Sequence, residues 1–316
     1  MPEGVTGEAA APHEIPAREW GHVLRRAGGH FMTARLPLLS AGVAFFAILS
    51  IAPVLVTALS VYGAVNTPEQ AVRQLAGLSR MLPTEVQPVV ADQLTTITAS
   101  STQVHTRRGL TGLALALWTA TAAMTYLIDA LTVAYHEDET RGFGRRTRLA
   151  LVFVLGSAVL LGGVIAAVGI VSRSLHEAPH AVREVAPLVI WLALATLMAA
   201  GLAVLYRFAP DRRQARWRWI SWGAATATVL WLAASVGLFA YVRSLGTYES
   251  TYGSLAGVAI SMFWLWVSVA LVLLGATINA ETERQTARDS TIGVERPIGE
   301  REAVVADSTP PYTNDG

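Results

Sequence analysis

The sequence feature that most constrains the fold is the run from Ser250 to Ala280, which contains no Asp, Glu, Arg or His. With a rise of about 1.5 Å per residue, a helix of this length exceeds the roughly 30 Å hydrocarbon core of a bilayer. Its small and polar residues recur at helical spacing and share one face: Ser254, Gly257, Ser261, Ser268 and Gly275. Because small residues let helix backbones approach closely in lipid, this face is expected to pack against neighbouring helices.

The rest of the chain repeats this apolar pattern. Of its 316 residues, 53% are hydrophobic and only 15% are charged, whereas about a quarter of a soluble domain is charged. Six apolar stretches are long enough to cross a bilayer, with expected spans at residues 36–65, 110–135, 149–172, 185–206, 219–242 and 252–279. We therefore predict an all-α, polytopic membrane protein with a six-helix transmembrane bundle.

Two residue types are missing from the sequence, and their absence excludes several kinds of chemistry. The chain has no cysteine, which excludes disulfides, thiolate nucleophiles and cysteine-ligated metal centres. All 24 of its basic residues are arginine, so it has no Walker lysine and no lysine that could form a Schiff base. No catalytic residue, no metal and no cofactor are expected, and the protein is not expected to be an enzyme.

Four segments flank or interrupt the spans of the predicted membrane domain, residues 36–281. Residues 1–17 and 282–316 are polar and are expected to be disordered tails, the second of them cytoplasmic. Apolar and basic residues recur at helical spacing over residues 18–35, which predicts an amphipathic helix at the membrane interface. Residues 66–108 carry two helix-capping patterns and predict a small helical cap outside the membrane.

Arginine is concentrated on one side of the predicted bundle. It is frequent before the first span, in the second and fourth connections and after the last span: Arg18, Arg25, Arg26, Arg35, Arg141, Arg145, Arg146, Arg148, Arg207, Arg212, Arg213, Arg216, Arg218, Arg284, Arg288, Arg296 and Arg301. The positive-inside rule then places both termini in the cytoplasm. These clusters are expected to contact anionic lipid. Trp217 and Trp219 interleave with arginine, but this position is typical of a membrane interface, so no nucleic-acid partner is expected.

Asp129 is the one ionisable residue that the pattern places inside a span. Thr121, Thr125 and Thr132 follow the same helix face, and a polar face inside a bundle predicts a substrate or ion path, to which Asn279 of the last span is added. The alternative is that Asp129 lies close enough to the helix end to reach interfacial water or an arginine of the next loop.

Two further patterns have a structural and a functional interpretation. Pro53 lies inside the first span, where proline removes a backbone hydrogen bond, and the resulting kink is either packing geometry or a hinge. His176 to His180 matches the H-E-x-x-H pattern of zinc proteases, but Pro179 disrupts the helix that this pattern requires. We interpret this second stretch as a solvated loop.

Several stretches resemble the YihY/virulence factor BrkB family of bacterial inner-membrane proteins: Ala41 to Gly63 with its Leu49-Ser50-Ile51-Ala52-Pro53, Trp118 to Tyr135, Tyr206 to Pro210, and Tyr248 to Glu281. The last of these is the most specific, and it ends in Leu274-Gly275-Ala276-Thr277-Ile278-Asn279-Ala280-Glu281. The chain departs from the family pattern at Thr277, where a glutamate is usual, and at Thr132, where an asparagine is usual.

The resemblance implies a six-helix inner-membrane protein with both termini inside, and it leaves the activity open. The leading hypothesis is a transporter or flippase-like permease for a lipid, an envelope precursor or a small solute. The alternative is an envelope scaffold that recruits a partner, with a homo-oligomer also considered. A membrane-bound hydrolase of the ribonuclease type is third, since the sequence offers no acid–base pair or metal cluster for it.

Overall fold

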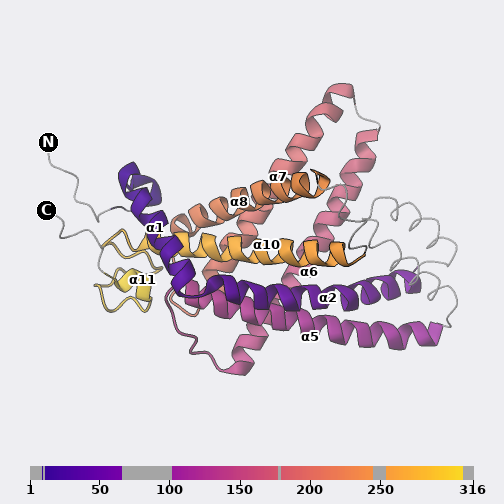
Figure 1. Ribbon diagram of the computed structural model, residues 1–316, viewed down its shortest axis with the longest axis horizontal. Helices are drawn as coiled ribbons and strands as arrows, with labels where there is room; N and C mark the ends of the chain where they lie inside the picture. Colours follow the sequence, from indigo (N-terminus) through magenta and orange to yellow (C-terminus); the bar gives the residue numbers. More distant parts are fainter. Residues whose placement is uncertain (1–8, 10, 66–101, 177–178, 245–253, 309–316) are drawn as a thin grey trace.

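The computed structural model describes residue 9 and residues 11–65, 102–176, 179–244 and 254–308. These residues form helices and connecting segments, and no β-strand occurs among them. The elements are η1 (Pro12–Glu14), α1 (Ala17–Thr33), α2 (Leu36–Val65), α5 (Thr102–Ala134), α6 (Phe143–His176), α7 (His180–Phe208), α8 (Trp217–Ser244), α10 (Ser254–Glu283) and α11 (Val304–Asp307) (Figure 1). Of the outer cap predicted over residues 66–108, residues 66–101 lie outside the described part, and residues 102–108 begin α5.

Within the described residues, six helices are long and apolar enough to cross a membrane, as the sequence predicted. The apolar segments are Leu36–Val54, Leu110–Ala134, Phe143–Val171, Val182–Phe208, Trp217–Arg243 and Gly257–Glu283. The all-α, six-span architecture is thereby confirmed. Pro53 lies inside α2, which continues to Val65.

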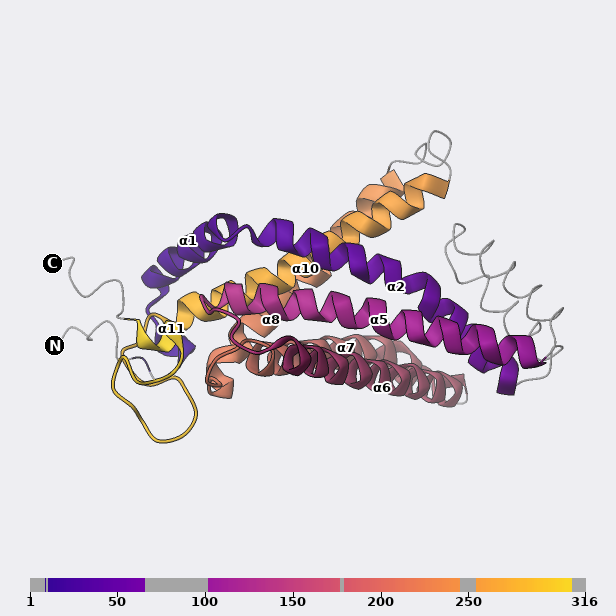
Figure 2. The same cartoon turned by 90° about the horizontal axis from the view of Figure 1, so that it is seen from below.

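The helices converge at one end of the bundle. α2 and α5 lie side by side, and α10 packs against α2, α8 and α1 (Figures 1 and 2). α7 pairs with α8, and α6 contacts mainly α5, while α6 and α7 lean away from the layer of α2, α5 and α10 (Figure 1). The first and last elements of the described chain also lie here: η1 contacts α8, and α11 contacts α10. We call this end of the bundle, where α1, the end of α10 and the α5–α6 and α7–α8 connections meet, the polar end.

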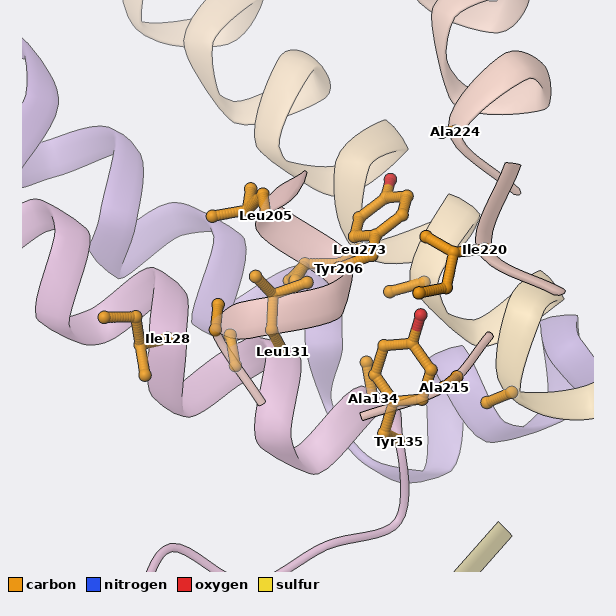
Figure 3. Close-up of a cluster of buried hydrophobic side chains, with 14 of the residues drawn as sticks. Ile128, Leu131, Ala134, Tyr135, Leu205, Tyr206, Ala215, Ile220, Ala224 and Leu273 are labelled. Atoms are coloured by element: carbon orange, nitrogen blue, oxygen red, sulfur yellow. The ribbon is translucent and has the colours of Figure 1, made fainter. Parts of the chain in front are cut away.

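The buried apolar core also lies at the polar end. Tyr135, Tyr206, Ile220 and Leu273, from four different segments, are almost wholly buried and surround one another (Figure 3). Away from this end the helices expose large apolar side chains, such as Val159, which is 78% exposed in α6. In a membrane protein such surfaces face lipid, and away from the polar end burial is limited to small side chains between helices, such as Ala44 and Ala116.

α8 and α10 cross in close contact at two glycines. A Cβ atom built on Gly223 would overlap the carbonyl oxygen of Gly275, and one built on Gly275 would lie 2.7 Å from that of Gly223. Further along the same seam, the Trp231 indole donates a hydrogen bond to Ser268 Oγ at 2.9 Å. Two residues of the predicted small-residue face, Gly275 and Ser268, therefore pack against α8.

The other predicted members of this face are less buried or have side chains outside the described residues. Gly257 is half-buried and Ser261 is exposed, and the side chain of Ser254 lies outside the described residues. Their part in helix packing stays a prediction.

The two tails differ from the sequence-based expectation of disorder. Residues 11–16, within the predicted tail 1–17, form η1 and bury Ala11, Pro12 and Ile15. Helix α1 then follows over Ala17–Thr33 and packs against α10. Val23 and Ala27 supply its buried apolar stripe, as the predicted amphipathic helix over residues 18–35 requires.

The described part of the tail predicted over residues 282–316 is folded. Arg301, 4% exposed, donates hydrogen bonds to the carbonyl oxygens of Ala287, Arg288, Arg296 and Ala306, and thereby gathers an irregular segment around one guanidinium. Polar composition suggested disorder because charged residues usually stay in water. Here arginine satisfies the backbone acceptors of the loop, so the expectation of disorder fails for residues 282–308.

We predict that Gly223→Ala destabilises the protein, because the added methyl group would force α8 and α10 apart. Gly237→Ala is the matched control on the same helix, where an added Cβ atom meets nothing within 4 Å. Alanine is favoured over glycine in helices by about 1 kcal/mol, so the control should be neutral or stabilising. Overpacking costs about 1–3 kcal/mol, and thermal unfolding in detergent should therefore rank Gly223→Ala below both the parent and the control. Equal melting temperatures would contradict the close crossing.

Candidate functional site

The carboxylate of Glu281, in the last turn of α10, joins three segments at the polar end. Its side chain is 1% exposed. Arg26 of α1 donates from Nε to Oε2 at 2.7 Å, and the His136 Nε2 atom, just after α5, lies 2.9 Å from Oε1. Arg284 adds a third contact at 3.1 Å. A buried carboxylate is costly unless it is paired and hydrogen-bonded, and Glu281 is both.

Two stacked histidines lie beside this carboxylate. The rings of His30 and His136 are 3.7 Å apart, and His30 Nε2 contacts the carbonyl oxygen of Val133 at 3.1 Å. Burial lowers the pKa of His30 below its ordinary value of 6.5, and the neighbouring His136 lowers it further. The Val133 carbonyl and Glu281 act in the opposite direction, and Arg284 adds to the lowering. The neutral imidazole of His30 is therefore the form that fits between α1 and α5.

A second buried ion pair fixes the α7–α8 connection to the end of α10. Arg212 donates to Glu283 from both terminal nitrogens, at 2.6 and 3.0 Å, and both side chains are 2% exposed. The Ser290 hydroxyl donates to the same carboxylate at 2.5 Å, and the Arg212 guanidinium lies 5.2 Å from the ring centre of Tyr135. Two parallel charge-assisted hydrogen bonds fix direction as well as distance. This pair therefore holds the folded tail against the bundle.

Asn279, which the sequence predicts to join a substrate or ion path, connects helices in the structure, and its part in a path stays a prediction. Its Oδ1 atom accepts a hydrogen bond from the Gly223 amide at 2.7 Å, and Nδ2 donates to the Ile220 carbonyl at 3.0 Å. Nδ2 also lies 3.4 Å from the Tyr135 hydroxyl. The side chain is buried and its hydrogen-bonding groups are occupied, so this geometry makes Asn279 a clamp between α8 and α10.

The predicted threonines bond within their own helix. The Thr125 hydroxyl donates to the Thr121 carbonyl oxygen at 2.7 Å, and the Thr132 hydroxyl donates to that of Ile128 at 3.0 Å. The Thr132 oxygen also lies 3.4 Å from the Asp211 amide. Thr121 and Thr125 are half-buried, whereas Thr132 is buried. The hydroxyl donors of Thr125 and Thr132 are satisfied locally, which leaves these two side chains only acceptor lone pairs for another group.

Asp129 points to a different neighbour from the other predicted path residues. Arg146 of α6 donates to its two carboxylate oxygens at 3.0 and 3.2 Å. The side chains of this pair are 30% and 25% exposed. The structure thus brings Thr132 and Asn279 to the core around Tyr135, and it places Asp129 between α5 and α6.

Sequence reasoning missed the two carboxylates that organise the polar end. Glu281 and Glu283 follow an apolar run, and this position suggested the start of a solvated tail. The signal for Glu281 was its place at the end of the stretch that resembles the family. For Glu283 the sequence offers only its proximity to that stretch, because its partner Arg212 is 71 positions away.

Six apolar helices fastened at one end by buried ion pairs define a multi-pass α-helical membrane protein. The chain belongs to the virulence factor BrkB family, whose model matches residues 27–298. This match begins within α1 and extends beyond the last span into the folded tail. Glu281, Glu283 and Arg212 therefore all lie inside the family region.

Curated relatives give the same class. The chain is 30% identical over 175 residues to the ribonuclease-like protein YfkH of Bacillus subtilis, which covers 54% of this chain and 63% of that protein. It is 28% identical over 280 residues to a UPF0761 membrane protein of Delftia acidovorans, with 84% of this chain and 62% of that protein covered. The corresponding protein of Ralstonia nicotianae is 27% identical over 267 residues, with 82% and 57% covered. The chain thus spans about three-fifths of the length of these relatives, and no solved structure matches it significantly.

We predict that the docking of α1 weakens as the pH falls below about 6.5. Because the folded-state pKa of His30 is lowered, the folded form binds fewer protons than the unfolded form, and stability is lost as the pH falls from 6.5 through the lowered pKa. Hydrogen exchange of residues 17–33, corrected for intrinsic rates, should be faster at pH 5.5 than at pH 7.5. His30→Gln should flatten this response, and an unchanged pH dependence in that variant would contradict the role of His30.

We also predict that Glu283→Gln lowers the free energy of unfolding by about 3–5 kcal/mol, because it leaves the buried Arg212 without its counter-charge. The matched control is Glu302→Gln, which removes the exposed pair with Arg296 and should cost no more than about 1 kcal/mol. Unfolding in mixed detergent micelles measures both values. Similar losses in the two variants would show that burial of the Arg212–Glu283 pair contributes little.

Proposed function

We propose that this protein is a transporter or flippase-like permease for a lipid, an envelope precursor or a small solute. The observation that carries the proposal is the ion pair between Asp129 of α5 and Arg146 of α6, both within apolar helices long enough to span a membrane. Charged side chains at membrane depth are costly, and they commonly mark substrate or ion pathways. An ion pair that joins two spans is a contact whose opening could be coupled to movement.

The loose attachment of α6 supports this proposal. Among residues 143–171, all of them described, Ala150 alone is buried. Ala150 lies one turn beyond Arg146, so α6 is held to α5 mainly near the polar end, while its remaining length leans away from the α2 and α5 layer with α7 (Figure 1). Opening the Asp129–Arg146 pair would release the strongest polar contact between α6 and the bundle.

In this proposal a polar headgroup or ion passes between α5 and α6. Arg146 would attract a negative charge on the passing group, and Asp129 would attract a positive one. The ion pair between Asp129 and Arg146 would open while either side chain contacts that group. Thr121 and Thr125 would extend the polar face along α5 through their acceptor lone pairs, while Thr132 and Asn279 hold the helices together. The hinge assigned to Pro53 remains part of the prediction.

The orientation and the non-enzymatic character belong to the same proposal. The arginine-rich segments lie at the polar end. The positive-inside rule therefore supports placing this end and both termini on the cytoplasmic side of a bacterial inner membrane. The two most buried carboxylates, Glu281 and Glu283, are each held by an arginine, an arrangement that favours structure over proton transfer. A scaffold role is the second candidate, because α1 and the folded tail form an ordered surface outside the spans.

We predict that Asp129→Asn and Arg146→Gln each lower the rate of lipid scrambling or ion-coupled transport at least tenfold in reconstituted liposomes. The exchange of both residues, Asp129→Arg with Arg146→Asp, should recover part of the rate by restoring the pair. Glu302→Gln, which alters an exposed ion pair in the tail, is the control and should match the parent. Unchanged rates for Asp129→Asn would remove it from the path. A folded parent protein that moves nothing, yet crosslinks stoichiometrically to one partner, would favour the scaffold.

A further inference from the structure

A basic cleft lies at the polar end between the start of α6 and the end of α7. Its volume is about 510 Å³. Its lining includes one carboxylate, that of Asp211, several apolar side chains and five arginines: Arg141, Arg145, Arg148, Arg207 and Arg212. Neither Asp129 nor Arg146 lines this cleft, so it is distinct from the proposed path.

Two of the five arginines are already engaged by carboxylates. Arg141 contacts Glu139 at 2.7 Å and Asp211 at 3.5 Å, and Arg212 is held by Glu283. Asp211 is engaged as well: burial alone would raise its pKa, but hydrogen bonds from Thr140 and the charge of Arg141 outweigh this and lower it. Asp211 therefore stays ionised and committed to these neighbours. It does not neutralise the remaining arginines.

The remaining three cationic side chains have no carboxylate partner in the described part of the chain. Arg145 and Arg148 lie on one face of α6, where Arg148 donates a 3.4 Å hydrogen bond to the carbonyl oxygen of Gly144 in its own helix. The guanidinium of Arg207 lies 4.4 Å from the ring centre of Trp217. Its Nε and Nη1 atoms are buried and donate no hydrogen bond to any residue in the described part of the chain. Buried donors without partners are rare and costly, so they point to an absent acceptor.

The cleft also has the polarity of a membrane-interface site. Along α6, which begins at Phe143, Leu149 and Val152 follow Arg145 and Arg148 toward the middle of the span, and Phe208, the last residue of α7, adds an apolar ring beside Arg207. Trp217, 49% exposed, marks the interface level beside Arg207. A free phosphate ion would match the arginines and leave the apolar wall unused. A ligand with a phosphate group on an acyl-bearing backbone matches both.

We propose that this cleft binds the phosphate headgroup of an anionic phospholipid, with Arg145, Arg148 and Arg207 as its ligands. The planar guanidinium groups of Arg145 and Arg148 approach the phosphate from α6, and the two unpartnered nitrogens of Arg207 donate to it from α7. The acyl chains then follow Leu149 and Val152 along α6 into the bilayer, with Phe208 covering the glycerol backbone at the end of α7. Binding would bridge α6 and α7 at the polar end. This site does not depend on transport activity, since an equilibrium binding measurement detects it.

Native mass spectrometry of the full chain in detergent tests this proposal, with phosphatidylglycerol and phosphatidylcholine of identical acyl chains as probes. The site variant is Arg145→Gln, Arg148→Gln and Arg207→Gln combined. The matched control, Arg18→Gln, Arg25→Gln and Arg218→Gln, removes the same charge from exposed positions at the same end. An arginine near an anionic surface contributes roughly a fivefold effect, so the site variant should lose phosphatidylglycerol binding at least tenfold. The control should lose less than about threefold.

Several outcomes would overturn the proposal. Equal losses in both triple variants would show that diffuse charge attracts the lipid, and no loss in either would show that the cleft is not occupied. Displacement of phosphatidylglycerol by millimolar inorganic phosphate, or equal binding of phosphatidylcholine, would assign the site to another ligand. If the triple variant is not monodisperse, Arg148→Gln alone decides the question, because this side chain is exposed and its variant should lose about fivefold.

Discussion

The buried carboxylate of Glu281 is the point on which the polar end depends. Its negative charge is covered by protein, and besides Arg284 nearby in the sequence it is satisfied by Arg26 and His136, which come from other segments. Each of those segments is in turn held in place by the carboxylate. α1, the end of α5 and the end of α10 therefore have to meet in one arrangement, since any other would leave a buried charge without a partner.

Buried polar contacts of this kind replace the hydrophobic driving force that helix association lacks in a bilayer. In lipid, apolar side chains gain little by moving from acyl chains to another helix, so association relies on close packing and polar contacts. The molecule combines both at one end, where Gly223 approaches Gly275 and where Arg212 and Glu283 are paired. α6, which has one buried residue over residues 143–171, lacks such contacts along most of its length. The helices are thus held together most firmly at the polar end, and α6 has few contacts along the rest of its length.

Local patterns were sufficient for the spans and insufficient for the polar end. Hydropathy predicted the last span at residues 252–279, and α10 occupies Ser254–Glu283, because length and polarity are local properties. The same criterion ended the span before Glu281 and Glu283, since it cannot register that an arginine from another segment neutralises each charge. For Asp129, the sequence left a path and an arginine of the next loop as alternatives, and the structure supplies Arg146 as the neighbour.

The distance in sequence between Arg26 and Glu281 has a consequence for how the protein is made. Their hydrogen bond joins positions 255 residues apart. At about 5–20 residues per second, the ribosome needs roughly 13–50 s after making α1 before it has made the partner of Arg26. The first five spans are synthesised during this interval. Neither α1 nor the histidine pair can contact the Glu281 carboxylate until the interval ends. Closure of the polar end is therefore a late step of biogenesis, and a chain arrested before Glu281 would display α1 undocked, a feature that quality-control proteases could distinguish from the finished protein.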